Sequence, residues 1–238
     1  MRRPALIPVG VAMIALAACG SGTPSTPSPP TASVAGLQNQ SSSQVLTAAQ
    51  NAFSSATSVQ AKGRVVSDGK TLDFTLQLPK SGGAQGSFVI DNDNYQVILL
   101  DDALYFKTDT AAVERKYGQQ VAALIGERWI KTTADDQDFK SFASLTYTNL
   151  SDSLNRQTAK SVPPVATTAN GQPAVTIVLS DGTNLAVANA GPAYPLRSEQ
   201  PGQGAIDLSN YNSVPPVVAP TDFIDLAKLQ SASPTPTS

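Results

Sequence analysis

The 238-residue chain contains no histidine, one cysteine and one tryptophan, and only 14% of its residues are charged. Without histidine it lacks the usual general base of a Ser-His-Asp triad and the commonest zinc ligand. A lone cysteine cannot close an intramolecular disulfide. The 16 basic and 18 acidic residues give a net charge of −2 and suggest no basic face for nucleic acid. We therefore expect no enzyme and no nucleic-acid partner, and nothing indicates a cofactor.

Two short segments partly match known functional motifs, one catalytic and one calcium-binding. The segment Ser67-Asp68-Gly69-Lys70 matches S-x-x-K by letter. That motif needs a helix to bring Ser and Lys onto one face, whereas Asp-Gly predicts a hairpin tip. The segment Asp91-Asn92-Asp93-Asn94 begins like a calcium loop, but Tyr95 stands where an oxygen ligand is expected. We predict no catalytic residue and no metal site.

Cys19 follows a short export segment. Arg2 and Arg3 form a positive start, and residues 6–18 form an apolar run that is too short to span a bilayer. The sequence Leu16-Ala17-Ala18-Cys19 resembles the bacterial lipobox, in which the cysteine thiol is acylated and the peptide is cut before it. This predicts lipidation at Cys19 and attachment to the extracytoplasmic face of the cell membrane. An ordinary secretory signal with a buried cysteine is the alternative.

Composition divides the chain into four parts. Residues 1–18 are the predicted signal peptide, and residues 19–40 are rich in Ser, Thr and Pro and carry no charge. Such a stretch cannot bury enough apolar surface to fold, so we expect a disordered tether. Residues 41–229 are long enough for one folded domain, and residues 230–238 form a second polar tail.

Hydrophobic periodicity predicts both strands and helices. In residues 71–78 every second residue is apolar, which is typical of a half-buried antiparallel strand. A capping box at Ser41 to Gln44 predicts a helix with Val45, Leu46, Ala49 and Phe53 on one face. Further strands are expected at residues 61–66, 85–91, 95–100, 103–107, 129–130, 175–179, 185–188, 195–197 and 205–208.

Three later segments have helical spacing. Val113, Tyr117, Val121, Leu124 and Ile125 form a single stripe that ends at Gly126. A second helix is expected to begin near Asp135 and Asp136, with Phe139 and Phe142 on its apolar side, and a third over residues 221–229. This order of elements predicts an α+β fold with a single curved antiparallel β-sheet, a half-barrel, and helices packed over its concave face.

Several short segments carry a resemblance to a known family. The lipobox, the tether, the helix before the first hairpin, Leu104-Tyr105-Phe106, Trp129-Ile130-Lys131 and Tyr194-Pro195-Leu196-Arg197 together resemble the LppX/LprAFG family of mycobacterial lipoproteins. That family is similar in fold to the bacterial lipoprotein carriers, which enclose a hydrophobic cavity between sheet and helices.

The resemblance implies that the chain carries or presents an acylated lipid, glycolipid or lipoglycan, with an envelope exporter as a further partner. A structural or partner-binding lipoprotein with a filled core is the alternative, and a surface-anchored hydrolase is a third. Candidate cavity residues are those expected on the inward faces of the strand and helices: Phe74, Leu76, Leu78, Val113, Tyr117, Val121, Leu124, Phe139 and Phe142.

Overall fold

The computed structural model describes residues 36–67, 69–90, 92–133, 146–226 and 228. Its helices are the 3-10 turn η1 (Leu37–Asn39), α1 (Ser42–Ser55), α2 (Thr110–Tyr117), α3 (Gln119–Ile125) and α5 (Tyr147–Asn155). Its strands are β1 (Ser58–Ser67), β2 (Lys70–Pro79), β3 (Ala84–Ile90), β4 (Asp93–Leu100), β5 (Ala103–Thr108), β6 (Trp129–Thr133), β7 (Val165–Ala169), β8 (Gln172–Val178), β9 (Asn184–Ala188), β10 (Pro195–Gln200), β11 (Gly204–Ser209) and β12 (Phe223–Asp225).

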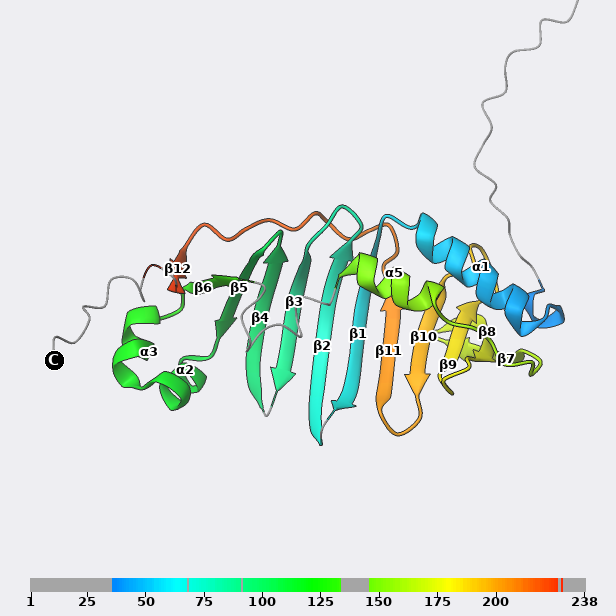
Figure 1. The fold of residues 1–238 in the computed structure, drawn as a ribbon, viewed down its shortest axis with the longest axis horizontal. Helices are drawn as coiled ribbons and strands as arrows, with labels where there is room; N and C mark the ends of the chain where they lie inside the picture. Colours follow the sequence, from blue (N-terminus) through cyan, green and yellow to red (C-terminus); the bar gives the residue numbers. More distant parts are fainter. Residues whose placement is uncertain (1–35, 68, 91, 134–145, 227, 229–238) are drawn as a thin grey trace, which may run out of the picture. The chain divides into compact units, whose positions relative to one another are not determined.

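The strands form one 12-stranded sheet in the order β12-β6-β5-β4-β3-β2-β1-β11-β10-β9-β8-β7. Neighbouring strands pair antiparallel, except that β12 runs parallel to β6. The sheet is open, with β12 and β7 at its edges, and α5 crosses β1 and β11 on one face (Figure 1). The predicted α+β class and the open, mostly antiparallel half-barrel are confirmed.

Strand alternation places the main core on the face that α5 covers. In β2, Phe74, Leu76 and Leu78 are buried, as the period of two requires. They join a cluster that runs across the neighbouring strands to Phe88 and Leu104. The predicted capping box is also present, since the Ser41 side chain accepts from the Gln44 backbone and the Gln44 side chain from that of Ser41. The direction of the β2 side chains and the start of α1 therefore agree with the sequence prediction.

The folded part of the chain begins earlier than predicted. Leu37, assigned to the tether by composition, is fully buried and packs in a cluster with Val45 and Val187. Its backbone N–H donates to Asn189 Oδ1 at 3.0 Å. A few scattered apolar residues in a polar segment give no periodicity, so only the tertiary contact reveals the burial of Leu37. The predicted signal peptide, Cys19 and the rest of the tether up to residue 35 lie outside the described residues, as do residues 229–238.

The predicted single helix over Val113 to Ile125 is wrong, because the chain forms two helices. They meet at Gly118, whose φ of 88° and ψ of 162° interrupt the helical hydrogen bonding. The predicted closing helix over residues 221–229 is also wrong at Phe223–Asp225, which form β12 beside Trp129 to Lys131 of β6. The helix expected near Asp135 lies outside the described residues.

Candidate ligand-binding site beneath helix α5

Helix α5 was absent from the sequence prediction, although it carries a capping residue. The Thr146 hydroxyl accepts a hydrogen bond from the backbone N–H of Asn149 at 3.2 Å. Tyr147, Leu150 and Leu154 then follow at helical spacing of three and four residues, which places them on one side of the helix. Tyr147 is buried, and Leu150 and Leu154 pack against the core clusters. This side of α5 therefore faces the sheet.

Both ends of α5 are tied to α1. The Tyr147 hydroxyl is hydrogen-bonded to the carbonyl oxygens of Phe53 and, at 2.9 Å, Ala56. Its ring stacks on Phe53 with the ring centroids 5.0 Å apart. At the other end, Gln50 Nε2 donates to the carbonyl oxygen of Leu154 at 3.1 Å. Helix α5 is thus held at its ends, while its middle spans the strands.

A first apolar pocket of about 190 Å³ lies between α5 and the strands β1, β2 and β11. Its wall on the sheet is entirely hydrophobic, and polar side chains occur only on the helix side. The lining residues are Ala61, Phe74, Leu76, Leu78 and Ile206 from the sheet, and Thr146, Asn149, Leu150 and Ser153 from the helix and its cap.

A second pocket, also of about 190 Å³, lies on the other side of α5 over β9, β10 and β11. It shares Leu150 and Ser153 with the first pocket, so the same two helix residues border both. Asp181 stands at a polar end, where the Thr183 backbone N–H donates to its carboxylate at 2.9 Å and lowers its pKa. Its apolar lining includes Phe53, Leu154, Leu179, Leu185, Pro195 and Leu208.

An aromatic group packs around Phe53, which lines the second pocket. The rings of Phe53 and Tyr211 meet edge to face with their centroids 6.2 Å apart, and Tyr194 stacks on Tyr211 with the centroids 4.0 Å apart. Tyr211 donates to the carbonyl oxygen of Pro195 at 2.6 Å. Burial raises the pKa of Tyr147 to about 12 and that of Tyr211 well above its ordinary value. These phenols therefore act as neutral donors to the backbone carbonyl oxygens of Phe53, Ala56 and Pro195.

The structure separates the predicted cavity residues into groups. Phe74, Leu76 and Leu78 line the first pocket, whereas Val113 is buried in the core cluster and lines neither pocket. Val121 and Leu124 were expected to face inward, but 37% and 53% of their surfaces are exposed.

The break at Gly118 explains the error at Val121 and Leu124. It resets the helical phase, so that α3 buries Ala122 and Ile125 instead. The side chain of Tyr117, and Phe139 and Phe142 altogether, lie outside the described part of the chain. Leu150 and Ser153, which border both pockets, were missed together with α5, although the Thr146 cap is a usable signal.

The described residues of the two motif-like segments lie at the ends of strands or in turns. Ser67 pairs with Lys70 across the β1–β2 hairpin, so they do not share a helical face. Asn92, with φ of 72°, lies in the turn between β3 and β4, and Asp93 begins β4. Among the described residues, no three His, Cys, Asp or Glu side chains come together as a metal site. No helix in these ranges is long and apolar enough to cross a membrane.

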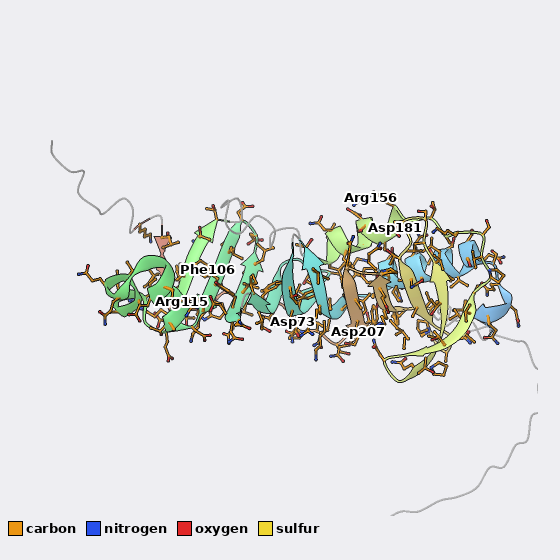
Figure 2. All side chains as sticks on the ribbon, turned by 90° about the horizontal axis from the view of Figure 1, so that it is seen from below. Asp73, Phe106, Arg115, Arg156, Asp181 and Asp207 are labelled. Atoms are coloured by element: carbon orange, nitrogen blue, oxygen red, sulfur yellow. The ribbon has the colours of Figure 1, made fainter. Side chains whose placement is uncertain are left out.

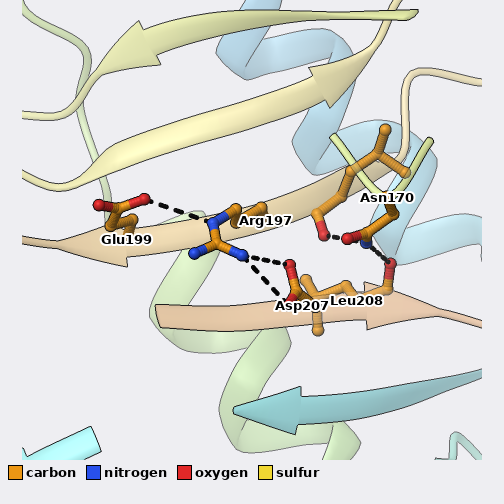
Figure 3. Close-up of polar contacts among 6 residues, drawn as sticks. Asn170, Arg197, Glu199, Asp207 and Leu208 are labelled. Atoms are coloured by element: carbon orange, nitrogen blue, oxygen red, sulfur yellow. Dashed lines mark hydrogen bonds and ion pairs between the residues drawn. The ribbon is translucent and has the colours of Figure 1, made fainter. Parts of the chain in front are cut away.

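The face of the sheet away from α5 carries paired charges on β1, β2, β10 and β11. Arg64 of β1 makes two hydrogen bonds to Asp73 of β2, at 2.6 and 2.9 Å, and these lower the pKa of Asp73. Burial works to lower the pKa of Arg197, but Asp207 and Glu199 outweigh it and raise the pKa. Arg197 contacts Asp207 at 3.0 Å and Glu199 at 3.3 Å (Figure 3). Asp73 and Asp207 lie on the side of the sheet away from α5 (Figure 2).

Fold and pockets together define an α+β domain in which an open antiparallel sheet carries apolar pockets beneath a helix. Among solved structures, the chain is similar to LprF from Mycobacterium bovis, with 12% identity, a TM-score of 0.48, and coverage of 75% of this chain and 96% of LprF. LprF shares its name with the family that the sequence resembles.

Two structures of MucB with MucA, one of them from Pseudomonas aeruginosa, match 76% of this chain at 14% identity. Their TM-scores are 0.31 and 0.34, and 57% and 58% of their chains are covered. No protein-family model and no curated protein matches the chain. At such identities a likeness concerns the fold alone, so function must be argued from the pockets.

Proposed function

We propose that the chain is a lipid-anchored protein of the extracytoplasmic membrane face, which carries or presents an acylated lipid or lipoglycan. The acyl part lies between α5 and the sheet, and Cys19 carries the anchor. One observation supports the ligand: two apolar pockets lie on either side of α5 and share Leu150 and Ser153. The lipobox-like sequence before Cys19 supports the anchor.

Each pocket alone is small for a ligand. Typical small-molecule sites enclose about 300–1,000 Å³, whereas each pocket here encloses about 190 Å³. Outward movement of α5 would join the two volumes, because its residues Leu150 and Ser153 border both pockets. Burying an acyl chain gains about 0.8 kcal/mol per methylene group. A few methylenes therefore offset the loss of the Tyr147 and Gln50 hydrogen bonds, at about 1 kcal/mol each.

The rims favour an uncharged or hydroxyl-rich headgroup over an anionic one. Asn149 and Ser153 border the first pocket, and Gln157 and Asp181 stand at the second. Amides and hydroxyls bond sugar or glycerol hydroxyls in either direction. The Asp181 carboxylate, with its lowered pKa, repels a phosphate placed beside it.

A partner-binding lipoprotein with a filled core is the second candidate. The exposed Val121 and Leu124 on α3 favour it, because large exposed apolar side chains close together mark protein-contact surfaces. This candidate predicts that the pockets stay closed and that α3 contacts a protein in the envelope.

Uptake of a fluorescent sixteen-carbon fatty acid by the chain from Gly20 to Ser238 tests the proposal. We expect saturable binding, and native mass spectrometry of protein secreted by a related host to show a co-purified acylated lipid. Leu150→Trp places a larger side chain at a position that borders both pockets and should weaken uptake at least tenfold. Thr148→Trp, on the exposed side of the same helix, is the matched control and should bind like wild type.

Two results would contradict acyl-chain binding. One is an unliganded mass together with no uptake of the fatty acid. The other is unchanged uptake by a Leu150→Trp variant whose thermal unfolding matches that of Thr148→Trp. Either result moves the function to partner binding.

A further inference from the structure

A groove lies over β2, β3 and β4, on the face of the sheet that bears the paired charges and away from α5. It encloses about 370 Å³ and is separate from the pockets beneath α5. Its polar groups are three amides and two hydroxyls, with one indole beside them: Gln77, Gln85, Gln96, Thr75, Ser87 and Trp129. None of the described residues that line it is charged.

Strand register arranges these groups in two rows. Thr75 of β2 lies opposite Ser87 of β3, which lies opposite Gln96 of β4. In the second row Gln77 of β2 lies opposite Gln85 of β3, and Ile98 of β4 lies opposite Gln85. Neighbouring strands are about 4.8 Å apart, so the first row offers a hydrogen-bonding group on each of three strands and the second row on two. The groove therefore presents five neutral hydrogen-bonding side chains beside the apolar Ile98.

The amides retain bonding capacity for a ligand. Gln85 Nε2 donates to Gln77 Oε1 at 2.6 Å, which fixes the two side chains against each other. An amide has two donor hydrogens and an acceptor oxygen, so the Gln77 NH₂ and the Gln85 carbonyl oxygen remain for a partner. A sugar hydroxyl both donates and accepts, and so satisfies either group. The described residues that line the groove supply no counter-charge for a phosphate or an ammonium group, and the one charged side chain that the register places beside Gln96 is Lys107 of β5.

Trp129 adds the apolar component that saccharide binding requires. It is the only tryptophan of the chain, and it is partly exposed at the start of β6. The face of an aromatic ring is negative, and the C–H groups on one side of a pyranose are weakly positive. A pyranose can therefore pack on the indole while its hydroxyls reach the amides.

Gly86 lies at the groove where the backbones of β2 and β3 come close together. A Cβ on Gly86 would lie 2.0 Å from the carbonyl oxygen of Thr75, which no side chain tolerates. Strands β2 and β3 thus approach closely at this point of the groove. Gln77 and Gln85 lie directly opposite each other in the register of these two strands, which brings their side chains within bonding distance.

We propose that this groove binds an uncharged saccharide, with the amide rows bonding its hydroxyls and Trp129 packing on a ring face. The site is independent of acyl-chain binding, because it lies on the opposite face of β2. It would let one domain hold a lipid on one face and a neutral glycan on the other.

Trp129 fluorescence and saturation-transfer NMR test this proposal with the chain from Gly20 to Ser238. The probes are maltotriose, mannotriose and chitotriose, each up to about 10 mM, which covers dissociation constants near 1 mM. We expect saturable binding of at least one probe. Gln96→Leu should weaken it at least tenfold, whereas Gln172→Leu, at an exposed strand glutamine of β8, should leave it unchanged.

The fluorescent fatty acid separates this site from the pockets beneath α5. Gln96→Leu should take up the fatty acid like wild type, and Leu150→Trp should still bind the saccharide by NMR. Absence of saturable binding for all three probes would overturn the proposal, whatever the fatty acid does. Equal loss in Gln96→Leu and Gln172→Leu would overturn it as well.

Discussion

The two faces of strands β1, β2 and β11 differ in the interactions that their side chains make. Toward α5 they present Phe74, Leu76 and Leu208, which are buried and leave pockets beneath the helix. Away from α5 they present ion pairs such as Asp73 with Arg64, both partly solvated. Full burial of a large apolar side chain contributes about 1.5–3 kcal/mol, whereas water and salt screen a solvated ion pair, so that it contributes little to stability.

Stability and recognition are therefore divided between the faces. The apolar face holds the fold together, and its pockets exist because large side chains and α5 do not fill all the space between them. The polar face adds little stability, so its side chains are free to vary or to bind a ligand. Adjacent residues of one strand should consequently respond very differently to the same substitution.

Phe88 and Ser87 of β3 provide the strongest test of this comparison. Phe88 is 1% exposed in the core cluster, while its neighbour Ser87 is exposed on the other face. Phe88→Ala should lower the free energy of unfolding by about 3–5 kcal/mol, because it removes buried area and leaves a cavity. Ser87→Ala should change it by less than about 0.5 kcal/mol. Urea unfolding measures both, and similar values would contradict the division.

Much of this alternation could be predicted from sequence. Leu72 to Leu78 alternate with polar residues, and Asp68-Gly69 marks the hairpin that places β2 beside β1. Local patterns of this kind fix side-chain direction without tertiary information. The inward direction of Phe74, Leu76 and Leu78 followed directly, and all three line the first pocket.

Long-range and marginal elements were harder to predict. Helix α5 has only two leucines among polar residues, so its burial depends on Tyr147 reaching the end of α1. Strand β12 is three residues long, and only pairing with β6 distinguishes it from a helical turn. The β7–β8 hairpin does have a local signal that went unused, since Asn170-Gly171 forms its two-residue turn with positive φ at both positions.

Tyr147→Phe tests whether the hydrogen bonds of the Tyr147 hydroxyl hold helix α5 in place between the two pockets. The variant keeps the stacked ring but leaves the carbonyl oxygens of Phe53 and Ala56 without this donor. We expect a loss of about 1–3 kcal/mol in unfolding free energy at neutral pH. Faster uptake of the fatty acid in stopped-flow measurements should accompany it, because α5 then moves outward more easily. Unchanged stability and rate would show that the ring alone holds α5.

The dependence of stability on alkaline pH is a second test of the Tyr147 hydrogen bonds. The Tyr147 pKa is about 12 in the folded chain against an ordinary value of 10.0, so the folded state holds its proton more tightly. The contribution of Tyr147 to the free energy of unfolding is fully present below pH 10. It decreases by about 2 kcal/mol as pH rises from 10 to 12. Since Phe does not titrate, the stability gap between wild type and Tyr147→Phe should narrow between pH 9 and pH 11.5. A constant gap would contradict this linkage.

Asp207→Asn should have a smaller effect on the polar face. Arg197 contacts both carboxylate oxygens of Asp207, at 3.0 and 3.2 Å, and the two side chains are 40% and 36% exposed. Loss of a half-exposed pair of this kind costs about 0.5–1 kcal/mol. Glu199 keeps a contact with Arg197 in the variant, which limits the loss. Urea midpoints compared with wild type measure it, and a loss as large as that of Phe88→Ala would contradict the comparison.

Asp73→Asn should have the smallest effect of the series. The Arg64 side chain is 70% exposed, so water and salt screen its pair with Asp73. Because the folded-state pKa of Asp73 is lowered, the pair contributes above its ordinary pKa and is lost as pH falls through the folded value. The difference in urea midpoint between wild type and Asp73→Asn should therefore be small at pH 7, decrease as pH falls below the ordinary pKa of an aspartate, and disappear in about 1 M salt. A difference that survives in high salt would mean that Asp73 holds the strands by packing, and the polar face would then share the structural role of the apolar one.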